Sequence, residues 1–158
     1  MTRINKVEEL TGGTMQPASA NVKSGSYDPY KALASAIVEQ AAKDLRRAYR
    51  RRFNANDRIA EYQAAVAELE AAIEDADVEG DDEGLRRLHS NLAAARRMLS
   101  RARQMLTMAE RSVDECESFF VGDWFDTLSD LNGPALLDEI EREERIRHRK
   151  KVGAWDGQ

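Results

Sequence analysis

Apolar and small residues recur at alternating spacings of three and four along two long stretches of the chain, 38–76 and 85–120. Such a repeat keeps one apolar seam on a helix and predicts that the helix packs lengthwise on another helix. Arg52 is the one charged residue within the first seam. The seam positions are Val38, Ala41, Leu45, Ala48, Arg52, Ala55, Ile59, Tyr62, Val66, Leu69, Ile73 and Ala76 in the first stretch, and Leu85, Leu88, Leu92, Ala95, Leu99, Ala102, Leu106, Ala109, Val113, Cys116 and Phe120 in the second.

Capping residues and glycine predict where the two helices begin and end. Asp28 and Pro29 are typical of a helix start, because the carboxylate accepts bonds from free amides and proline fits the first turn. Gly80 can take positive φ and supplies the turn between the stretches. We therefore predict a long antiparallel coiled-coil hairpin with arms at about 28–78 and 82–120. In this hairpin, position i faces roughly position 160 minus i.

The segment "RRFNANDR" (51–58) leaves the continuity of the first helix open. Asn54 and Asn56 are poor residues for a helix interior, and Asp57 can cap a new helix. The apolar seam nevertheless stays in phase across the segment. A continuous helix is the preferred interpretation, and a kinked helix is the alternative.

Shorter helices are predicted after residue 120. Gly122 and Asp123 predict a cap and a short helix at about 123–131, and Asn132-Gly133-Pro134 predicts a turn into a last helix at about 134–150. Only the first half of that helix needs packing, so we expect the rest to be a charged helix or a fraying tail. The apolar positions of this helix are Leu136, Leu137, Ile140 and Ile146.

The predicted fold class is all-α, with short C-terminal helices that close the base of the hairpin. A single helical domain covers 27–150. The leader, 1–26, is rich in small and polar residues and buries too little to offset its ordering entropy. We expect it to be disordered and the tail, 151–158, to be flexible.

Large aromatic residues gather between positions 119 and 125, although aromatics make up only 6% of the chain. They follow the second helix back to the base, beside Tyr27, Tyr30, Leu33 and Ile37. A two-helix arm must widen there, so the preferred interpretation is a core that closes the base. An exposed aromatic binding face is the alternative. We define the base cluster as Phe119, Phe120, Trp124 and Phe125.

Two segments carry a resemblance: "YDPYKALASAIVEQAAKDLRRA" and "ECESFFVGDWFDTLSDLNGPALLDEI". Together they resemble small proteins encoded in prophages and integrative elements of Gram-positive bacteria. Those proteins pair a "LANAIVxQAxxDYRxA"-like helix with an "FFxSxWFxxLTDxDGxxLI"-like segment. The resemblance covers 27–50 and 115–140, about a third of the chain. It implies a mobile-element setting and a single unit built from both ends of the hairpin, but it carries no catalytic or binding residue over.

The departures from that pattern are small. Gly122 stands where serine is usual, and Asn132-Gly133-Pro134 stands where Asp-Gly-Glu is usual. Each replacement preserves the capping or turn role of its position. We therefore expect the same local shape.

Residue types that perform catalysis or bind metals form no recognisable pattern. His89 and His148 lie far apart on predicted exposed faces, and Cys116 occupies a seam position without a cation to lower its pKa. The acidic residues around 126–132 lack the spacing of a calcium loop. We expect neither enzyme activity nor a metal or cofactor. With no apolar run near 20 residues, we expect no membrane span and a cytoplasmic location in a bacterial host cell.

Charge is segregated along the chain, whose net charge is −5. Residues 61–83 carry ten acidic side chains and no basic one, and residues 114–144 carry eleven acidic side chains against one arginine. Between them, arginines occupy the middle of both arms. We define the Arg band as Arg46, Arg47, Arg50, Arg51, Arg58, Arg96, Arg97, Arg101 and Arg103.

The Arg band leaves several functions open. Arginine binds phosphates and releases counterions, yet no aromatic residues interleave here for base stacking. The charges can equally pair within the hairpin, hold a protein partner, or join two copies docked antiparallel, tip to middle. A homodimer fits each case, because a lone hairpin leaves its seam partly exposed.

The leading hypothesis is a non-enzymatic phage or mobile-element protein that binds a host or phage protein through the arm or the base cluster. A counter-defence inhibitor such as an anti-CRISPR is one form of it. The alternative is a nucleic-acid-binding accessory protein that uses the Arg band.

Overall fold

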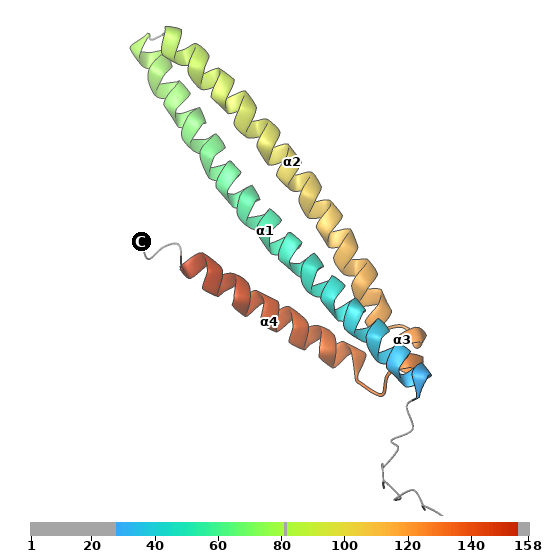
Figure 1. Cartoon of the computed structure of the whole chain (residues 1–158). Coiled ribbons are helices and arrows are strands. Elements are labelled where there is room, and N and C mark those ends of the chain that lie inside the picture. Colours follow the sequence, from blue (N-terminus) through green and yellow to red (C-terminus); the bar gives the residue numbers. More distant parts are fainter. Residues whose placement is uncertain (1–27, 81, 155–158) are drawn as a thin grey trace, which may run out of the picture.

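The computed structural model describes residues 28–80 and 82–154. The predicted leader, 1–26, and the last part of the predicted tail, 155–158, lie outside the described residues. The described part contains four helices and no strand, so the fold class is all-helical (Figure 1). The helices are α1 (Pro29–Glu79), α2 (Asp82–Phe120), α3 (Asp123–Leu128) and α4 (Gly133–Gly153).

Helix α1 begins and ends at the residues that the sequence indicates. The Asp28 carboxylate accepts hydrogen bonds from the amides of Tyr30, at 3.0 Å, and Lys31, at 3.4 Å. Gly80 ends the helix with φ 76°, and its amide donates to the carbonyl of Ala76. No break occurs at Asn54–Asn56. The kinked alternative is therefore wrong, and α1 is one helix of 51 residues.

Helices α1 and α2 pack against each other and run in opposite directions (Figure 1). Two side-chain contacts fix which residues lie at the same level: Tyr49 with Glu117, and Arg96 with Glu70. The residue numbers add up to 166 in both pairs. The register is therefore shifted by six from the expected sum of roughly 160.

All predicted seam positions are buried or half-buried. Most of the buried ones lie in the middle and at the base, whereas Leu92 is the buried position nearest the tip. The buried positions are Leu45, Ala48, Ala55, Leu92, Leu99, Ala102, Ala109, Val113 and Phe120.

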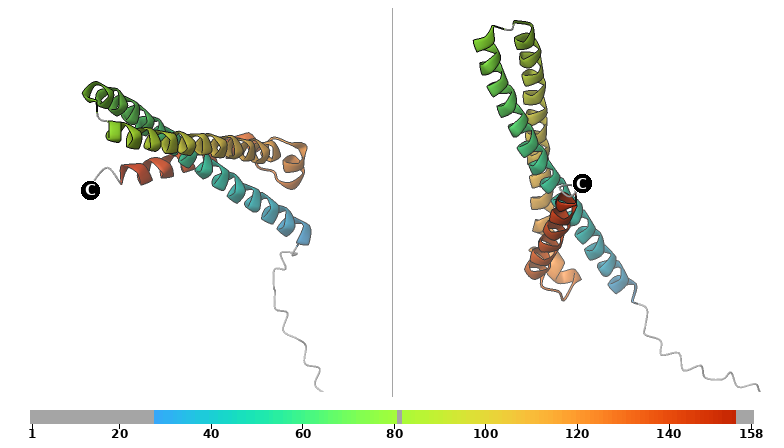
Figure 2. Two further views of the ribbon diagram at one scale, coloured as in Figure 1. Left: turned by 90° about the horizontal axis from the view of Figure 1, so that it is seen from above. Right: turned by 90° about the vertical axis from the view of Figure 1, so that its left-hand side faces the viewer.

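Helix α4 starts at the base and runs back along the middle of α1 (Figures 1 and 2). This contradicts the expectation that only its first half needs packing. Ile140 and Glu144 are both buried, whereas Ile146 is exposed. The helix continues to Gly153, so part of the predicted flexible tail is helical.

The main core lies at the base, where α1, α2, α3 and α4 meet. The α4 backbone begins against the end of α2: a Cβ on Gly133 would lie 1.8 Å from the carbonyl oxygen of Phe120. Only glycine fits this approach. The core consists of Leu45, Ala48, Tyr49, Val113, Phe120, Phe125 and Ile140.

Helix α3 is shorter than predicted and starts differently. It ends at Leu128, three residues before the predicted end. Gly122, not Asp123, holds the cap position, and no side chain caps this helix. Both views in Figure 2 show the first turns of α1 diverging from the end of α2. This divergence opens the base between α1 and α3.

Candidate interaction surfaces

Helix α4 engages part of the Arg band, because its glutamates form ion pairs with arginines on one side of α1. Arg46 Nη2 lies 3.1 Å from Glu143 Oε2, and Arg50 pairs with Glu144. Nearer the seam, Arg52 Nη2 lies 2.9 Å from Glu141 Oε1. These three arginines hold the last helix in place.

The Arg50–Glu144 pair is the least exposed of these contacts at its acidic end. Arg50 Nε donates to Glu144 Oε2 at 2.7 Å, and Nη2 donates to Oε1 at 2.8 Å. The Glu144 side chain is 3% exposed and that of Arg50 is 44% exposed. Hydrogen bonds from Arg50 lower the pKa of Glu144 despite its burial, and the same bonds raise the pKa of Arg50. The carboxylate is therefore held ionised inside the interface.

An aromatic stack completes the α1/α4 contact. The Arg52 guanidinium lies 4.9 Å from the Tyr49 ring centroid and 5.4 Å from that of Phe53. The ring centroid of His148 lies 5.3 Å from that of Phe53, and His148 Nε2 lies 2.9 Å from Asp57 Oδ2. The expectation of an exposed His148 is wrong. Arg52, the charged exception in the seam, is accounted for by this stack.

Tyr49 links the stack to α2. Its hydroxyl donates to Glu117 Oε1 at 2.7 Å, and the residue is almost completely buried. Burial, and then the bond to Glu117, raise the pKa of Tyr49. This hydrogen bond joins α1 to α2 inside the base core.

The remaining members of the Arg band have two environments. Arg96 pairs with Glu70 across the arm at 2.7 Å, and Arg47 pairs with Asp44 on its own helix at 3.3 Å. The others are exposed and form no ion pair with any residue in 28–80 or 82–154: Arg51, Arg58, Arg97, Arg101 and Arg103.

An open groove of about 520 Å³ lies between α1 and α2, on the side away from α4. Ala55, Ala109, Met105 and Met108 contribute its apolar part. Its polar lining includes Arg51, Asn54, Arg58, Arg111 and Ser112. We call it the mid-arm groove.

The base cluster is divided between the core and the surface. Phe120 and Phe125 are fully buried, and Phe119 packs edge-on against both rings, at 5.3 and 5.9 Å. Trp124, which we expected inside the core, is 67% exposed. It precedes Phe125 on a short helix, and adjacent helical residues point in different directions.

Trp124 lies beside a second groove, of about 820 Å³, between the first turns of α1 and the α3 region. Tyr30 and Leu33, expected to pack beside the aromatic core, are also more than half exposed. We call this the base groove. Its large apolar side chains are Tyr30, Leu33, Ile37, Trp124, Leu128 and Leu131.

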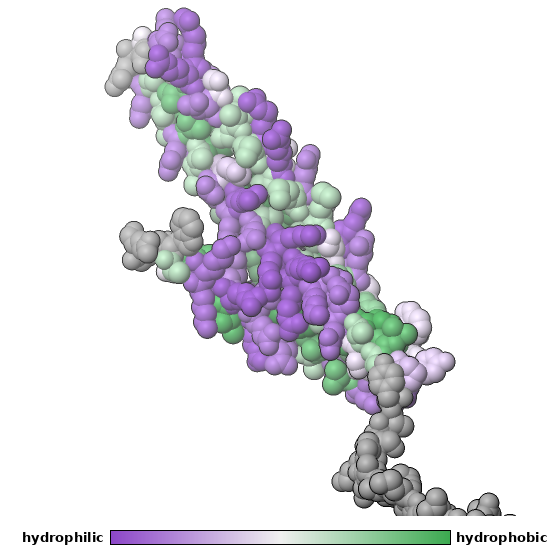
Figure 3. All heavy atoms as spheres, in the orientation of Figure 1, coloured by the Kyte–Doolittle hydropathy of each residue, from purple (hydrophilic) through white to green (hydrophobic). Residues whose placement is uncertain are grey.

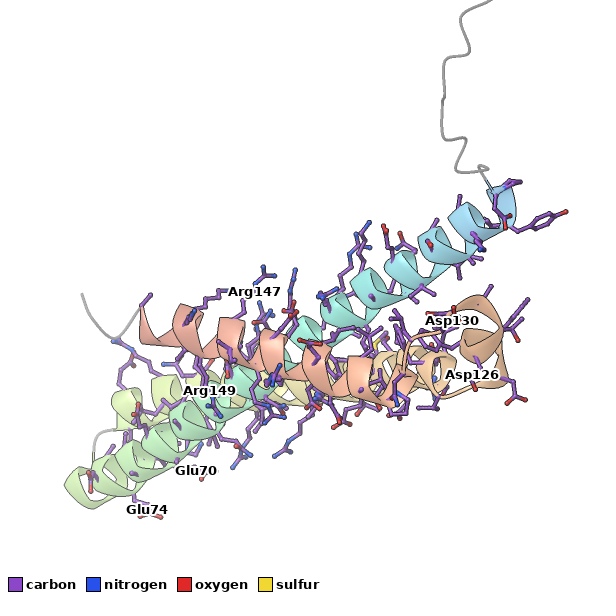
Figure 4. All side chains as sticks on the ribbon, turned by 90° about the horizontal axis from the view of Figure 1, so that it is seen from below. Glu70, Glu74, Asp126, Asp130, Arg147 and Arg149 are labelled. Atoms are coloured by element: carbon purple, nitrogen blue, oxygen red, sulfur yellow. The ribbon has the colours of Figure 1, made fainter. Side chains whose placement is uncertain are left out.

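The charged residues form successive zones along the molecule. In Figure 4, Asp126 and Asp130 lie at the base, Arg147 and Arg149 lie on α4, and Glu70 and Glu74 lie towards the tip. Figure 3 shows hydrophilic side chains covering α4 and hydrophobic ones at the base. The base groove thus combines an apolar lining with acidic neighbours.

The candidate metal ligands of the described residues do not come together. These residues include no cluster of three His, Cys, Asp or Glu side chains able to hold a metal ion. Cys116 is half-buried, and burial, followed by the charges of Asp44, Glu115 and Glu117, raises the pKa of its thiol. None of the described helices combines the length and the apolar character needed to cross a membrane.

The glutamates and the histidine of α4 are the contact residues that the sequence analysis missed. The sequence does carry a pattern that marks this face of α4: Ile140, Glu144 and His148 follow one another at intervals of four residues and so share one side of the helix. That face lies opposite the most arginine-rich part of α1. Charged residues at such spacing are usually solvated, so the pattern alone does not indicate packing.

The comparison with known proteins finds no match: no protein-family model, no curated protein and no solved structure matches this chain.

Proposed function

We propose that the protein is a non-enzymatic interaction protein that binds a protein partner through the base groove. The observation that supports this is the group of large apolar side chains left open there. Tyr30, Leu33, Trp124 and Leu131 are between 59% and 81% exposed and line one groove. Contiguous exposed apolar side chains are typical of interaction sites, and tryptophan and tyrosine are common anchors in them.

The partner we propose presents an apolar helix flanked by basic side chains. The groove is open to solvent and lined by apolar side chains from two elements, which suits a helix that lays apolar anchors into it. Asp130 lines the groove on its α3 side, and Lys31 is its one basic lining residue. Asp123 and Asp126, on α3 itself, add two carboxylates outside the lining and make the neighbourhood of the groove acidic. Basic residues on the partner would complement this acidic rim and raise the association rate more than the final affinity.

The α1/α2 pair then serves as a coiled-coil hairpin that holds the groove at one end of a long arm. Burial of the heptad positions along both helices supports this assignment. At 1.5 Å per residue, 51 residues give α1 a length of about 75 Å. The arm is a rigid spacer with further surface for binding.

The biological setting rests on the resemblance alone. Proteins similar to segments 27–50 and 115–140 imply that the chain is encoded by a mobile element. We propose that its partner is a host or phage protein in the cytoplasm of the bacterial host cell. Inhibition of a host defence system, as by an anti-CRISPR, is one form of this function.

The nucleic-acid alternative has less support. Glutamates of α4 pair with Arg46 and Arg50, and Glu70 pairs with Arg96, so these side chains are already engaged. Five arginines of the Arg band remain without such pairs, but no aromatic residue lies in the lining of the mid-arm groove to stack with bases.

Position-specific photocrosslinking tests the proposed site. A benzophenone amino acid replaces Trp124 or Leu33 in the full chain, and His89, exposed on α2 towards the tip, provides the matched control. A crosslink to the same partner protein at both base positions, and none at 89, is the expected result. Synthetic helical peptides with an apolar stripe and either lysine or glutamate flanks then test the chemistry, with Trp124 fluorescence as the readout.

The proposal fails if the base positions give no adduct above the level of the control. It also fails if both peptides leave the Trp124 emission unchanged, or if the glutamate-flanked peptide binds as well as the lysine-flanked one. Loss of lysine-peptide binding on Leu33→Ser, with unchanged helical content, would support the site.

A further inference from the structure

One side of the α1/α2 pair stays uncovered. Helix α4 occupies the opposite side, and among the described residues no helix lies over the mid-arm groove. Met98, Met105 and Met108 occupy one face of α2 on this side and are 39% to 72% exposed. Adaptable apolar side chains left open in a row indicate a surface that another molecule covers.

The charges on the same side of α1 change sign along the helix from the base towards the tip. Arg51 and Arg58 lie towards the base, and Glu68 and Asp75 lie towards the tip. Arg51 and Arg58 are seven residues apart, and so are Glu68 and Asp75. Ten residues separate Arg58 from Glu68, which turns the acidic pair by roughly 50–80° around the helix and leaves both pairs on neighbouring parts of one broad face. All four are exposed, and none forms an ion pair with a residue that the structure describes.

We propose that a second copy of the chain docks antiparallel on this side and forms a symmetric dimer. A two-fold axis at the level of residue 63 in α1 places Arg58 opposite Glu68 of the partner subunit. It also places Arg51 opposite Asp75 of the partner subunit, because both pairs of residue numbers add up to 126. The basic residues of each copy thus face the acidic residues of the other, so that the same surface is complementary to itself, as an isologous interface requires.

Helix α2 supports the same axis independently. Paired residues of α1 and α2 have numbers that add up to 166, as in Tyr49–Glu117 and Arg96–Glu70. The level of residue 63 on α1 is therefore that of residue 103 on α2. An axis there places Met98 opposite Met108 of the partner subunit, so the axis chosen from the charges also brings the methionine rows together.

The antiparallel arrangement is favoured over a parallel one by charge. In a parallel dimer the two-fold axis would run along the arm. Helix α1 of one protomer would then pack on α2 of the other, with both copies at the same level. Arg58 would then lie near Arg111, which lines the same groove. Like charges across an interface oppose association, so the parallel form is disfavoured.

Sedimentation equilibrium of the full chain, with charge reversals, tests the proposal. Arg58→Glu and Glu68→Arg are made singly and together, and Arg103→Glu on the other side of α2 is the control. Within one chain, residues 58 and 68 lie about 15 Å apart along the helix and cannot pair. By symmetry each substitution acts twice, so each single change should weaken the dimer about tenfold or more.

The double variant should recover an affinity close to that of the wild type, since both pairs are restored with reversed signs. The control should not change it. A wild-type chain that stays monomeric at a few hundred micromolar would overturn the proposal. So would a dimer indifferent to both single reversals, or a double variant weaker than either. Circular dichroism of each variant checks that the helices remain formed, and these outcomes are independent of partner binding at the base groove.

Discussion

Replacing Arg50 by alanine should weaken the docking of α4 more than replacing its partner, Glu144. The two side chains share the same hydrogen bonds but differ in exposure: 44% for Arg50 and 3% for Glu144. Without Glu144, the guanidinium can turn to water. Without Arg50, the ion pair left to the buried carboxylate among residues 28–80 and 82–154 is the one with Arg147, at 3.5 Å.

The expected magnitudes follow from these exposures. Breaking a fully buried ion pair costs roughly 3–5 kcal/mol, and the partial exposure of Arg50 reduces this. We expect about 2–3 kcal/mol for Arg50→Ala and about 1–2 kcal/mol for Glu144→Ala. Each kcal/mol lowers the melting temperature by roughly 2–4 °C for a chain of this size.

Urea unfolding and hydrogen exchange of the α4 amides measure the effect, because α4 can detach before the arm unfolds. The Arg50→Ala/Glu144→Ala double variant completes a mutant cycle. Equal costs for the two single variants, a larger cost for Glu144→Ala, or additivity in the cycle would refute the reasoning.

The same pair predicts a pH dependence. The pKa of Glu144 is lowered in the folded protein, so its contribution to stability is present above its unfolded pKa, about 4.3. This contribution is lost as the pH falls through the folded pKa. The stability difference between wild type and Glu144→Gln should therefore shrink below about pH 4. A difference that stays constant down to the acid transition would contradict the assignment.

Four further outcomes are expected. Gly133→Ala should cost about 1–3 kcal/mol or more in unfolding free energy, because its Cβ would meet the Phe120 backbone, whereas Gly153→Ala, with nothing within 4 Å, should not destabilise. Tyr49 should resist ionisation in an absorbance titration, since its pKa is raised, and stability should fall as the pH rises above about 10, where the unfolded chain ionises. Trp124, measured in a variant without the other tryptophan, should emit as a water-exposed indole and be quenched readily by acrylamide. Duplex DNA, single-stranded DNA and RNA should not bind at about 50 mM salt; binding that falls steeply with added salt would restore the nucleic-acid alternative.

The parts of the fold predicted from sequence are those with local signals. Asp28 and Gly80 take their predicted roles because caps and turns depend on a few neighbouring residues. The seam positions are buried or half-buried as their spacing predicts, because burial of apolar surface is the strongest force that drives folding.

The position of α4 and the opening of the base could not be predicted in this way. Glu144 and His148 are polar in sequence, and only their three-dimensional partners show that they pack. Trp124 is apolar in sequence, but its exposure depends on the path of α1 away from α3, which no repeat encodes. Sequence therefore located the aromatic cluster without separating its buried rings from its exposed one.

The core at the base joins residues that are far apart along the chain, and this affects synthesis on the ribosome. Arg46 and Glu143 are separated by 97 positions, and Ile140 completes the core around Leu45. The turn at Gly80 can form early, but the aliphatic surface of α1 near the base stays without its cover until α4 has emerged. A nascent chain halted before residue 140 would expose that surface and leave Arg46 and Arg50 without their acidic partners. We therefore expect the late part of translation to be the interval in which this protein depends most on chaperones.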